Sequence, residues 1–287
     1  MREVLLTETS YNVEKGRLPF DLGAFDLDGT VLRRDLTITE ATVDAMRALR
    51  ERGVRLVVAM GRRFEGAREH ATRLGFGEED PVVCYGGSMV RRMNGETLLH
   101  RTLPKDVSVE VLEWAAESEL HARVFTDGGI VISPETPAAV RHLRSREPDV
   151  EVVDSPAAWL LNGGEDPTKL VIVDRPARVQ SWLDEAQRTF SGLFVTRSLP
   201  HYVEVGGREG TKSEGLKFLC EYWEIDPART LAFGDAENDI DMLSFAGLGV
   251  AVGGMSEEVR AAADSVAPPV DEDGVASFVR DLLGGAT

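Results

Sequence analysis

Residues 22–30, with the sequence LGAFDLDGT, form an apolar run that ends in two aspartates one residue apart, Asp26 and Asp28. Far downstream, residues 231–239 (LAFGDAEND) form a second apolar run that ends in an acidic cluster. Buried strands seldom finish in clustered carboxylates, because an unpaired buried charge is costly. The two stretches therefore predict a bound cation, and Mg²⁺ is the candidate because it binds carboxylates, water and substrate phosphate groups.

Strands and helices alternate around the first of these stretches. Apolar runs at 22–27, 54–59 and 81–85 predict buried strands. Between them lie two amphipathic segments, one that Thr39 can cap and one over residues 63–74. This strand–helix alternation is typical of a parallel sheet, so the sequence predicts an α/β fold with a Rossmann-like parallel-sheet core.

The pattern changes in the middle of the chain. Strand-like runs at 123–126 and 130–132 flank an Asp-Gly-Gly turn, which predicts a β-hairpin. Further paired runs and helices predict an α+β unit inserted into the parallel-sheet domain, whose pattern returns after residue 206. The predicted boundaries are an N-terminal extension at 1–20, a core domain at 21–90 and 201–287, and a cap domain at 91–200, with a loop at 268–269.

Bulk properties restrict the partners. The 287 residues carry a net charge of −17, which disfavours nucleic acid and anionic membranes as partners because both are negatively charged. Two cysteines without a CxxC pair disfavour a zinc site or a disulfide framework. The sequence has no apolar run of the roughly 18 residues that a membrane helix needs and no signal-peptide pattern near its start. We therefore expect a cytoplasmic protein.

The predicted strands place several residues together. In an open parallel sheet, ligands bind beyond the carboxyl ends of the strands. Asp26, Met60, Gly86 and Asp235 all follow predicted strands. Calcium loops also use spaced aspartates, but here the chain continues with Val-Leu-Arg-Arg where such a loop would add oxygen ligands. The sequence therefore favours a magnesium and phosphate site at this edge of the sheet.

At these motifs the chain resembles the haloacid dehalogenase-like phosphatases, in particular their Cof-type branch. Residues 26–30 (DLDGT) match the first motif of that family, residues 210–213 (GTKS) match the segment with its lysine, and residues 234–239 (GDAEND) match its acidic motif. The resemblance covers residues 20–287, and the inserted block lies where Cof-type members carry their cap domain.

The resemblance implies a mechanism. Asp26 would attack phosphorus and form an aspartyl-phosphate. Asp28 would protonate the leaving alcohol and then activate the hydrolytic water. Lys212 would offset the negative charge between Asp26 and the phosphoryl group. Mg²⁺ would be held by Asp26, the Asp28 backbone carbonyl and Asp235, with Asp239 as a further ligand or as support.

The implied function is hydrolysis of a small phosphorylated metabolite, such as a sugar phosphate. Two alternatives remain open: a phosphotransferase or mutase, and a phosphate-binding regulator with a weakened site. Asn238 would orient the acidic loop, contact substrate or cap a helix. The motifs do not specify an oligomeric state.

Three positions depart from the family pattern. Met60 replaces the Ser or Thr whose hydroxyl would bind the phosphoryl group, and methionine cannot donate a hydrogen bond. Gly86 and Gly254 stand where the family commonly has asparagine. Other groups could bind the phosphoryl oxygens instead, and the candidates are the Gly61 backbone N–H, Arg62, Arg63 and Ser88.

Overall fold

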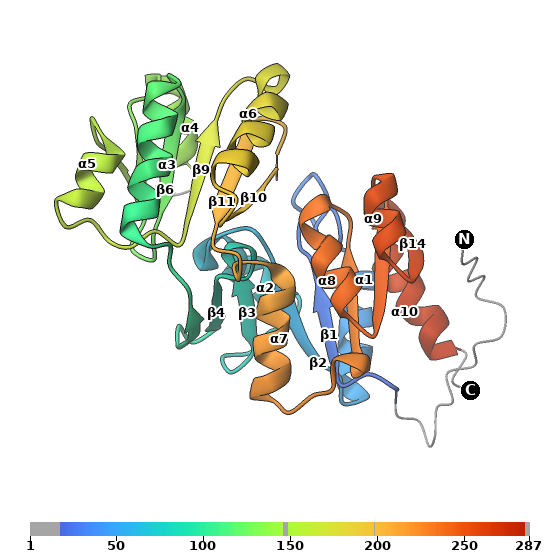
Figure 1. Ribbon diagram of the computed structural model, residues 1–287. Coiled ribbons are helices and arrows are strands. Elements are labelled where there is room, and N and C mark those ends of the chain that lie inside the picture. The colour runs from blue at the N-terminus through green and yellow to red at the C-terminus, as the bar shows by residue number, and fades with distance from the viewer. Residues whose placement is uncertain (1–17, 146–148, 198, 285–287) are drawn as a thin grey trace. The chain divides into compact units, whose positions relative to one another are not determined.

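The computed structural model describes residues 18–145, 149–197 and 199–284. They fall into two compact units (Figure 1). The core unit comprises the described residues up to Leu98 and from Lys212 onward, and the inserted unit comprises Leu99–Thr211. Both divisions fall later in the chain than the predicted boundaries at 90/91 and 200/201. The reason for the first difference is that two strands after residue 88 continue the core sheet.

An eight-stranded sheet lies at the centre of the core unit, in the order β14-β13-β12-β1-β2-β3-β4-β5. The strands from β14 to β3 pair in parallel, and β4 runs antiparallel to β3. This confirms the α/β fold with a parallel sheet. The strand bounds are β1 (Leu22–Phe25), β2 (Arg55–Ala59), β3 (Pro81–Cys84), β4 (Met89–Arg92), β5 (Thr97–His100), β12 (Thr230–Gly234), β13 (Leu248–Gly253) and β14 (Ser265–Pro269).

Helices cover both faces of this sheet (Figure 1). On one face Phe25 stacks on Phe233, which meets Phe278 of α10 edge-on. The strand register places Val83 on the opposite face, where it contacts α7 so closely at Gly215 that a Cβ there would lie 2.6 Å from a Val83 methyl. The helices are α1 (Glu40–Glu51), α2 (Phe64–Arg73), α7 (Lys212–Tyr222), α8 (Ile240–Phe245), α9 (Glu257–Ala262) and α10 (Gly274–Gly284).

The predicted start of α1 is confirmed. The Thr42 backbone N–H donates to Thr39 Oγ1 at 3.2 Å, as an N-cap requires. Met46 and Leu49 are fully buried on the side of the helix that faces the sheet. Helix α1 also packs against α10, so segments far apart in the sequence cover the same side of the core.

The inserted unit is an α+β fold around its own six-stranded sheet, in the order β10-β11-β9-β6-β7-β8. The predicted hairpin is confirmed, with β6 and β7 antiparallel around residues 126–129. Its apolar core lies between the sheet and α3, α5 and α6. The bounds are β6 (His121–Phe125), β7 (Ile130–Ile132), β8 (Val150–Val152), β9 (Lys169–Val173), β10 (Phe194–Thr196), β11 (Tyr202–Gly206), α3 (Lys105–Glu117), α4 (Pro137–Arg144), α5 (Pro156–Leu161) and α6 (Pro176–Thr189).

Two sequence predictions are wrong. Leu18 and Phe20 are 2% and 4% exposed, so the end of the predicted extension belongs to the core, because these apolar side chains are buried. Residues 1–17 of that extension lie outside the described residues. The predicted loop at 268–269 is the end of β14, which pairs with β13 at the edge of the sheet. An edge strand tolerates proline because it needs no N–H on its outer side.

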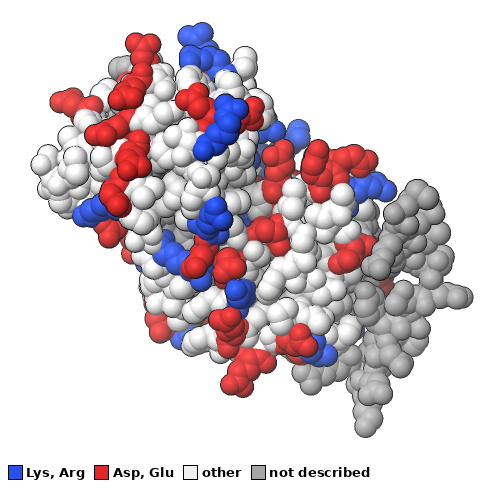
Figure 2. Space-filling view, viewed as in Figure 1, with Lys and Arg blue, Asp and Glu red and all other residues white. Residues whose placement is uncertain are grey.

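Two surface properties follow from the described residues. Within them, no helix is both long and apolar enough to cross a bilayer. On the face that Figure 2 shows, the described Lys and Arg side chains are interspersed with Asp and Glu. Among the described residues, that face therefore presents no continuous basic surface. The partners and the cellular location stay predictions from the sequence.

Candidate active site

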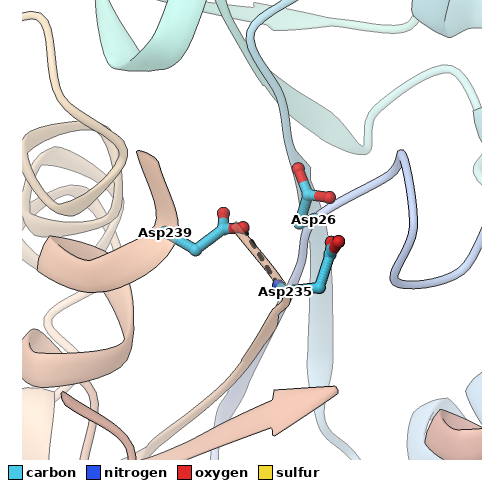
Figure 3. Close-up of side chains that lie close together, drawn as sticks. All are labelled: Asp26, Asp235 and Asp239. Carbon is cyan, nitrogen blue, oxygen red and sulfur yellow. Dashed lines mark hydrogen bonds between the residues drawn. The ribbon is translucent and has the colours of Figure 1, made fainter. Parts of the chain in front are cut away.

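The site lies where the two central strands of the core sheet end. Strands β1 and β12 are parallel neighbours, with Phe25 opposite Phe233. The Asp26 backbone N–H donates to the Phe233 carbonyl at 2.9 Å. Asp26 and Asp235, which are far apart in the sequence, therefore leave the same edge of the sheet side by side (Figure 3).

Three carboxylates meet at this point. Asp26, Asp235 and Asp239 each offer an oxygen, and these oxygens all lie within 4.8 Å of one another. Asp26 is 6% exposed and Asp239 is fully buried. Three anionic groups at this separation repel each other, and burial strengthens the repulsion.

Lys212 is the cation of this cluster. Its Nζ donates to Asp26 Oδ1 and, at 2.5 Å, to Asp239 Oδ1. The side chain is 1% exposed. Burial lowers the pKa of Lys212, but the adjacent Asp239 and Asp26 carboxylates outweigh this effect and raise the pKa above its usual value. Lys212 is therefore held as an ammonium group between two aspartates.

One lysine does not balance three carboxylates. Burial, and next the repulsion of Asp239, raise the pKa of Asp26 well above its usual value, although Lys212 opposes the rise. Burial and Asp239 also raise the pKa of Asp235, to about 6, against the hydrogen bond from Thr30. The cluster thus carries excess negative charge, which a divalent cation would relieve.

The surrounding backbone holds Asp239 in place. Its Oδ2 accepts hydrogen bonds from the backbone N–H groups of Asp235 and Ala236, both at 3.1 Å. Since Oδ1 is bonded to Lys212, both Asp239 oxygens already have protein partners. Asp239 is therefore suited to fixing the acidic loop and Lys212, whereas Asp26 and Asp235 have more capacity for an ion. These donors fit the predicted Mg²⁺, which prefers carboxylate oxygens.

The loop after β1 supports Asp235 from the other side. Thr30 Oγ1 donates to Asp235 Oδ1 at 2.8 Å, which fixes the orientation of that carboxylate. Gly29 has a φ of +90°, and a Cβ there would lie 2.4 Å from Asp235 Oδ2. The glycine is thus required both by the backbone conformation and by the carboxylate next to it.

Asp28 and Arg62 form an ion pair at this edge of the sheet. Arg62 Nε donates to Asp28 Oδ2 at 2.7 Å, and Arg62 Nη2 donates to Asp28 Oδ1. Half of the Asp28 side-chain surface is exposed. Arg62 follows β2 and Asp28 follows β1, so the pairing of adjacent strands brings them together.

The other predicted residues follow strands β2, β3 and β13 or lie in the acidic loop. Met60 is 1% exposed and Ser88 is 2% exposed, so both side chains are buried. Gly61 stands between Met60 and Arg62. Asn238 lies in the turn Glu237–Asp239, one residue from the buried carboxylate. Gly86 and Gly254 have φ values of 70° and 93°, a region that favours glycine.

Sequence reasoning missed three supporting contacts. Thr30 Oγ1 donates to Asp235, more than 200 residues further along the chain. Arg62, which the sequence offers as a group that binds the phosphoryl oxygens, donates to Asp28. Asp241 Oδ2 accepts the Ser213 backbone N–H at 3.0 Å and so fixes the first turn of α7, which carries Lys212. All three depend on residues from different segments, and no local pattern marks such pairs.

Known proteins are similar to this chain over most of its length. Residues 24–279 match the family model of the haloacid dehalogenase-like hydrolases. The chain is 27% identical over 269 residues to the 5-amino-6-(5-phospho-D-ribitylamino)uracil phosphatase YitU of Bacillus subtilis, covering 91% of this chain and 96% of that protein. It is 31% identical over 246 residues to the HMP-PP phosphatase of Cronobacter sakazakii, covering 84% and 86% respectively.

Solved structures agree with this relationship. A haloacid dehalogenase-like hydrolase from Bacteroides thetaiotaomicron matches with a TM-score of 0.78 at 26% identity, over 92% of this chain and 99% of that one. The family match spans both the core unit and the inserted unit. The chain therefore belongs to the haloacid dehalogenase-like hydrolases and, within them, to the Cof-type branch of phosphoric monoester hydrolases.

Proposed function

We propose that this protein is a Mg²⁺-dependent phosphatase that hydrolyses a small phosphorylated metabolite through an aspartyl-phosphate at Asp26. The observation that carries the proposal is the buried contact of Asp26 with Lys212, beside Asp235 and Asp239 at the end of the central strands. The relatives named above are phosphatases of small phosphorylated compounds, which supports the same substrate class here.

The residues divide the chemistry between them. An Asp26 carboxylate oxygen attacks phosphorus, and the bond from phosphorus to the ester oxygen breaks. Lys212 keeps a positive charge beside Asp26, which lowers the repulsion between that carboxylate and a dianionic phosphate. A bound Mg²⁺, held by Asp26, the Asp28 carbonyl and Asp235 with Asp239 as support, would supply charge neutralisation at the phosphoryl oxygens.

Asp28 moves the protons. It protonates the ester oxygen as the alcohol leaves, and it then takes a proton from the water that attacks the aspartyl-phosphate. Hydrolysis releases inorganic phosphate and regenerates Asp26. The Gly61 backbone N–H, Arg63 and Ser88 are proposed as groups that bind the phosphoryl oxygens, with Asn238 beside them, and the inserted unit is proposed to act as a cap that selects the substrate.

A substrate panel tests this function. We expect the protein to release phosphate from members of a panel of sugar phosphates, phosphoglycerates, nucleotides and 4-nitrophenyl phosphate when Mg²⁺ is present. Addition of EDTA should stop the release, and added Mg²⁺ should restore it. A folded protein that releases no phosphate from any panel member, or that is equally active in EDTA, would contradict the proposal.

Asp235→Asn should stabilise the metal-free protein at neutral pH. The folded protein holds the pKa of Asp235 at about 6, above its usual value in an unfolded chain, so ionisation of Asp235 destabilises the fold as pH rises through this range. Asparagine cannot ionise and keeps an oxygen for Thr30. In EDTA we expect a gain on the order of 2 kcal/mol at pH 7.5 in urea unfolding, which shrinks as the pH falls between the folded and unfolded pKa values and disappears below about pH 3.5.

The same variant tests the metal assignment. Added Mg²⁺ should stabilise the wild type and not Asp235→Asn, because the variant lacks a charged ligand. Asp264→Asn is a suitable control, since Asp264 accepts the Gly249 backbone N–H away from the cluster. A variant that Mg²⁺ stabilises as strongly as the wild type would refute the role of Asp235.

Met60→Thr should increase phosphate release and lower stability. Methionine offers no donor at this position, and one preorganised donor can change kcat by about 10²–10³-fold. Because Met60 is buried, the shorter and more polar side chain should cost about 1–3 kcal/mol in unfolding free energy. Met60→Val is the matched control, because valine has the shape of threonine but no hydroxyl. If the two variants have equal activity, a missing hydroxyl does not limit the enzyme.

A further inference from the structure

The ion pair between Asp28 and Arg62 is built for orientation. Two parallel N–H groups of the guanidinium meet the two oxygens of the carboxylate, Nε to Oδ2 at 2.7 Å and Nη2 to Oδ1. The side chains of Arg62 and Asp28 are 35% and 50% exposed. An ion pair with this exposure contributes at most about 1 kcal/mol to stability, whereas bidentate pairing fixes the plane of the carboxylate. The main effect of this ion pair is therefore to orient the Asp28 carboxylate, and its contribution to the free energy of unfolding is small.

Arg62 itself is held by the backbone around it. The Tyr85 backbone N–H donates to the Arg62 carbonyl at 2.9 Å, and the Gly86 N–H donates to the Met60 carbonyl at 2.9 Å. These bonds join the turn after β2 to the turn after β3. Arg62 Cδ lies 3.8 Å from the position that a Cβ on Gly66 would take, so its methylene groups lie along the first turn of α2. The backbone and the methylene groups of Arg62 are therefore held in place, and they fix the position of its guanidinium group.

The backbone of Asp28 is fixed by a β-bridge to Leu32, but its carboxylate is half exposed. Among the described residues Arg62 is the sole side chain that hydrogen-bonds that carboxylate. Without that bond its side chain could rotate between staggered conformations. A group that transfers protons must hold a heavy-atom distance of about 2.6–3.2 Å to its partner, and a misplacement of 1 Å can cost about 10²-fold in rate.

We propose that Arg62 is a positioning residue that orients the Asp28 carboxyl group for proton transfer; the proposal rests on the function proposed above. It replaces the direct substrate contact that the sequence predicted for Arg62. One of the two bonds can open while Asp28 exchanges a proton with the ester oxygen or with water, and the other bond keeps the carboxyl group in place. A lysine, which presents a point charge without the planar fork, cannot do this.

A double-mutant cycle on kcat tests the proposal, with ribose 5-phosphate as substrate and saturating Mg²⁺. Arg62→Met should lower kcat about 10–100-fold, with KM changed less than about threefold, and Arg62→Lys should recover only part of the loss. In an Asp28→Asn background the same Arg62→Met change should have little effect, because the group that it orients is gone. Arg68→Met removes an exposed arginine from α2, the helix that follows Arg62, and should leave kcat unchanged.

The possible outcomes separate the two proposals. Multiplicative effects of Arg62→Met and Asp28→Asn on kcat, or a rise in KM with kcat unchanged, would overturn the positioning role and leave the phosphatase assignment intact. If Asp26→Asn abolishes activity and the effects of Arg62→Met and Asp28→Asn on kcat are non-additive, the phosphatase assignment and the positioning role are both supported. A wild type that releases no phosphate from ribose 5-phosphate or from any other panel member overturns the phosphatase proposal, and the positioning role falls with it. Thermal unfolding of each variant must stay close to the wild type, as expected for an exposed ion pair.

Discussion

Asp26→Asn is expected to abolish phosphate release while the protein remains folded. The amide is not a nucleophile toward phosphorus, so the step that forms the aspartyl-phosphate cannot occur. We expect kcat to fall by at least about 10⁴-fold, as when nucleophiles of other hydrolases are removed. The asparagine keeps an oxygen that can accept the hydrogen bond from Lys212. Initial rates of phosphate release at saturating substrate and Mg²⁺ measure the effect.

The fold should tolerate this change because the wild-type carboxylate is unfavourably placed. Burial raises the pKa of Asp26 well above its usual value, so an ionised Asp26 is a cost to the folded state. The melting temperature of Asp26→Asn should equal or exceed that of the wild type in EDTA. Asp21→Asn, just before the same strand, is a matched control, because Asp21 pairs with Arg229 away from the cluster. Near-wild-type turnover by Asp26→Asn would disprove the nucleophile assignment.

Lys212→Met is expected to lower both stability and activity. The ammonium group bonds to Asp26 and Asp239, and all three side chains are buried. Removing one partner of a buried ion pair leaves uncompensated charge, which typically costs about 3–5 kcal/mol. Phosphate release should fall by at least about 10²-fold, since the cation beside the nucleophile is lost. Urea unfolding at pH 7.5 and steady-state kinetics measure the two effects.

The loss of stability should depend on pH in a defined direction. Lys212 opposes the rise in the pKa of Asp26, so without it this pKa should lie further above its value in the unfolded chain, and the folded variant becomes less stable as pH rises through it. The difference from the wild type should therefore be larger at pH 8 than at pH 5. Lys217→Met, on the exposed side of the same helix, should change neither property. A pH-independent difference would show that Lys212 acts through packing instead of charge.

Much of the fold follows from local sequence patterns. The apolar runs that predict strands coincide with β1, β2, β3 and β12, and Thr39 caps α1 as predicted. These features depend on periodicity and capping within a few residues, which the sequence shows directly. The acidic motifs also predict which residues gather, because parallel strands bring their carboxyl ends to one edge.

The predictions that failed depend on neighbours distant in the sequence. Strand β14 contains two prolines and becomes a strand only because β13 offers it an edge. Leu18 and Phe20 are isolated apolar residues at the end of a polar stretch, and only the tertiary structure shows that they are buried. The first division between the units lies after Leu98 and not at the predicted 90/91, because β4 pairs with β3 and so belongs to the core sheet.

The sequence by itself determined the fold class, the family motifs and the acidic residues at the strand ends, because all of these are encoded in short contiguous segments. Only the tertiary structure decided how the charges are paired: Lys212 lies between Asp26 and Asp239, Thr30 holds Asp235, and Arg62 holds Asp28. The physical reason is that hydrogen bonds and charge repulsion act over a few ångströms. Which groups come that close depends on strand order and helix packing, and neither is written in any single segment.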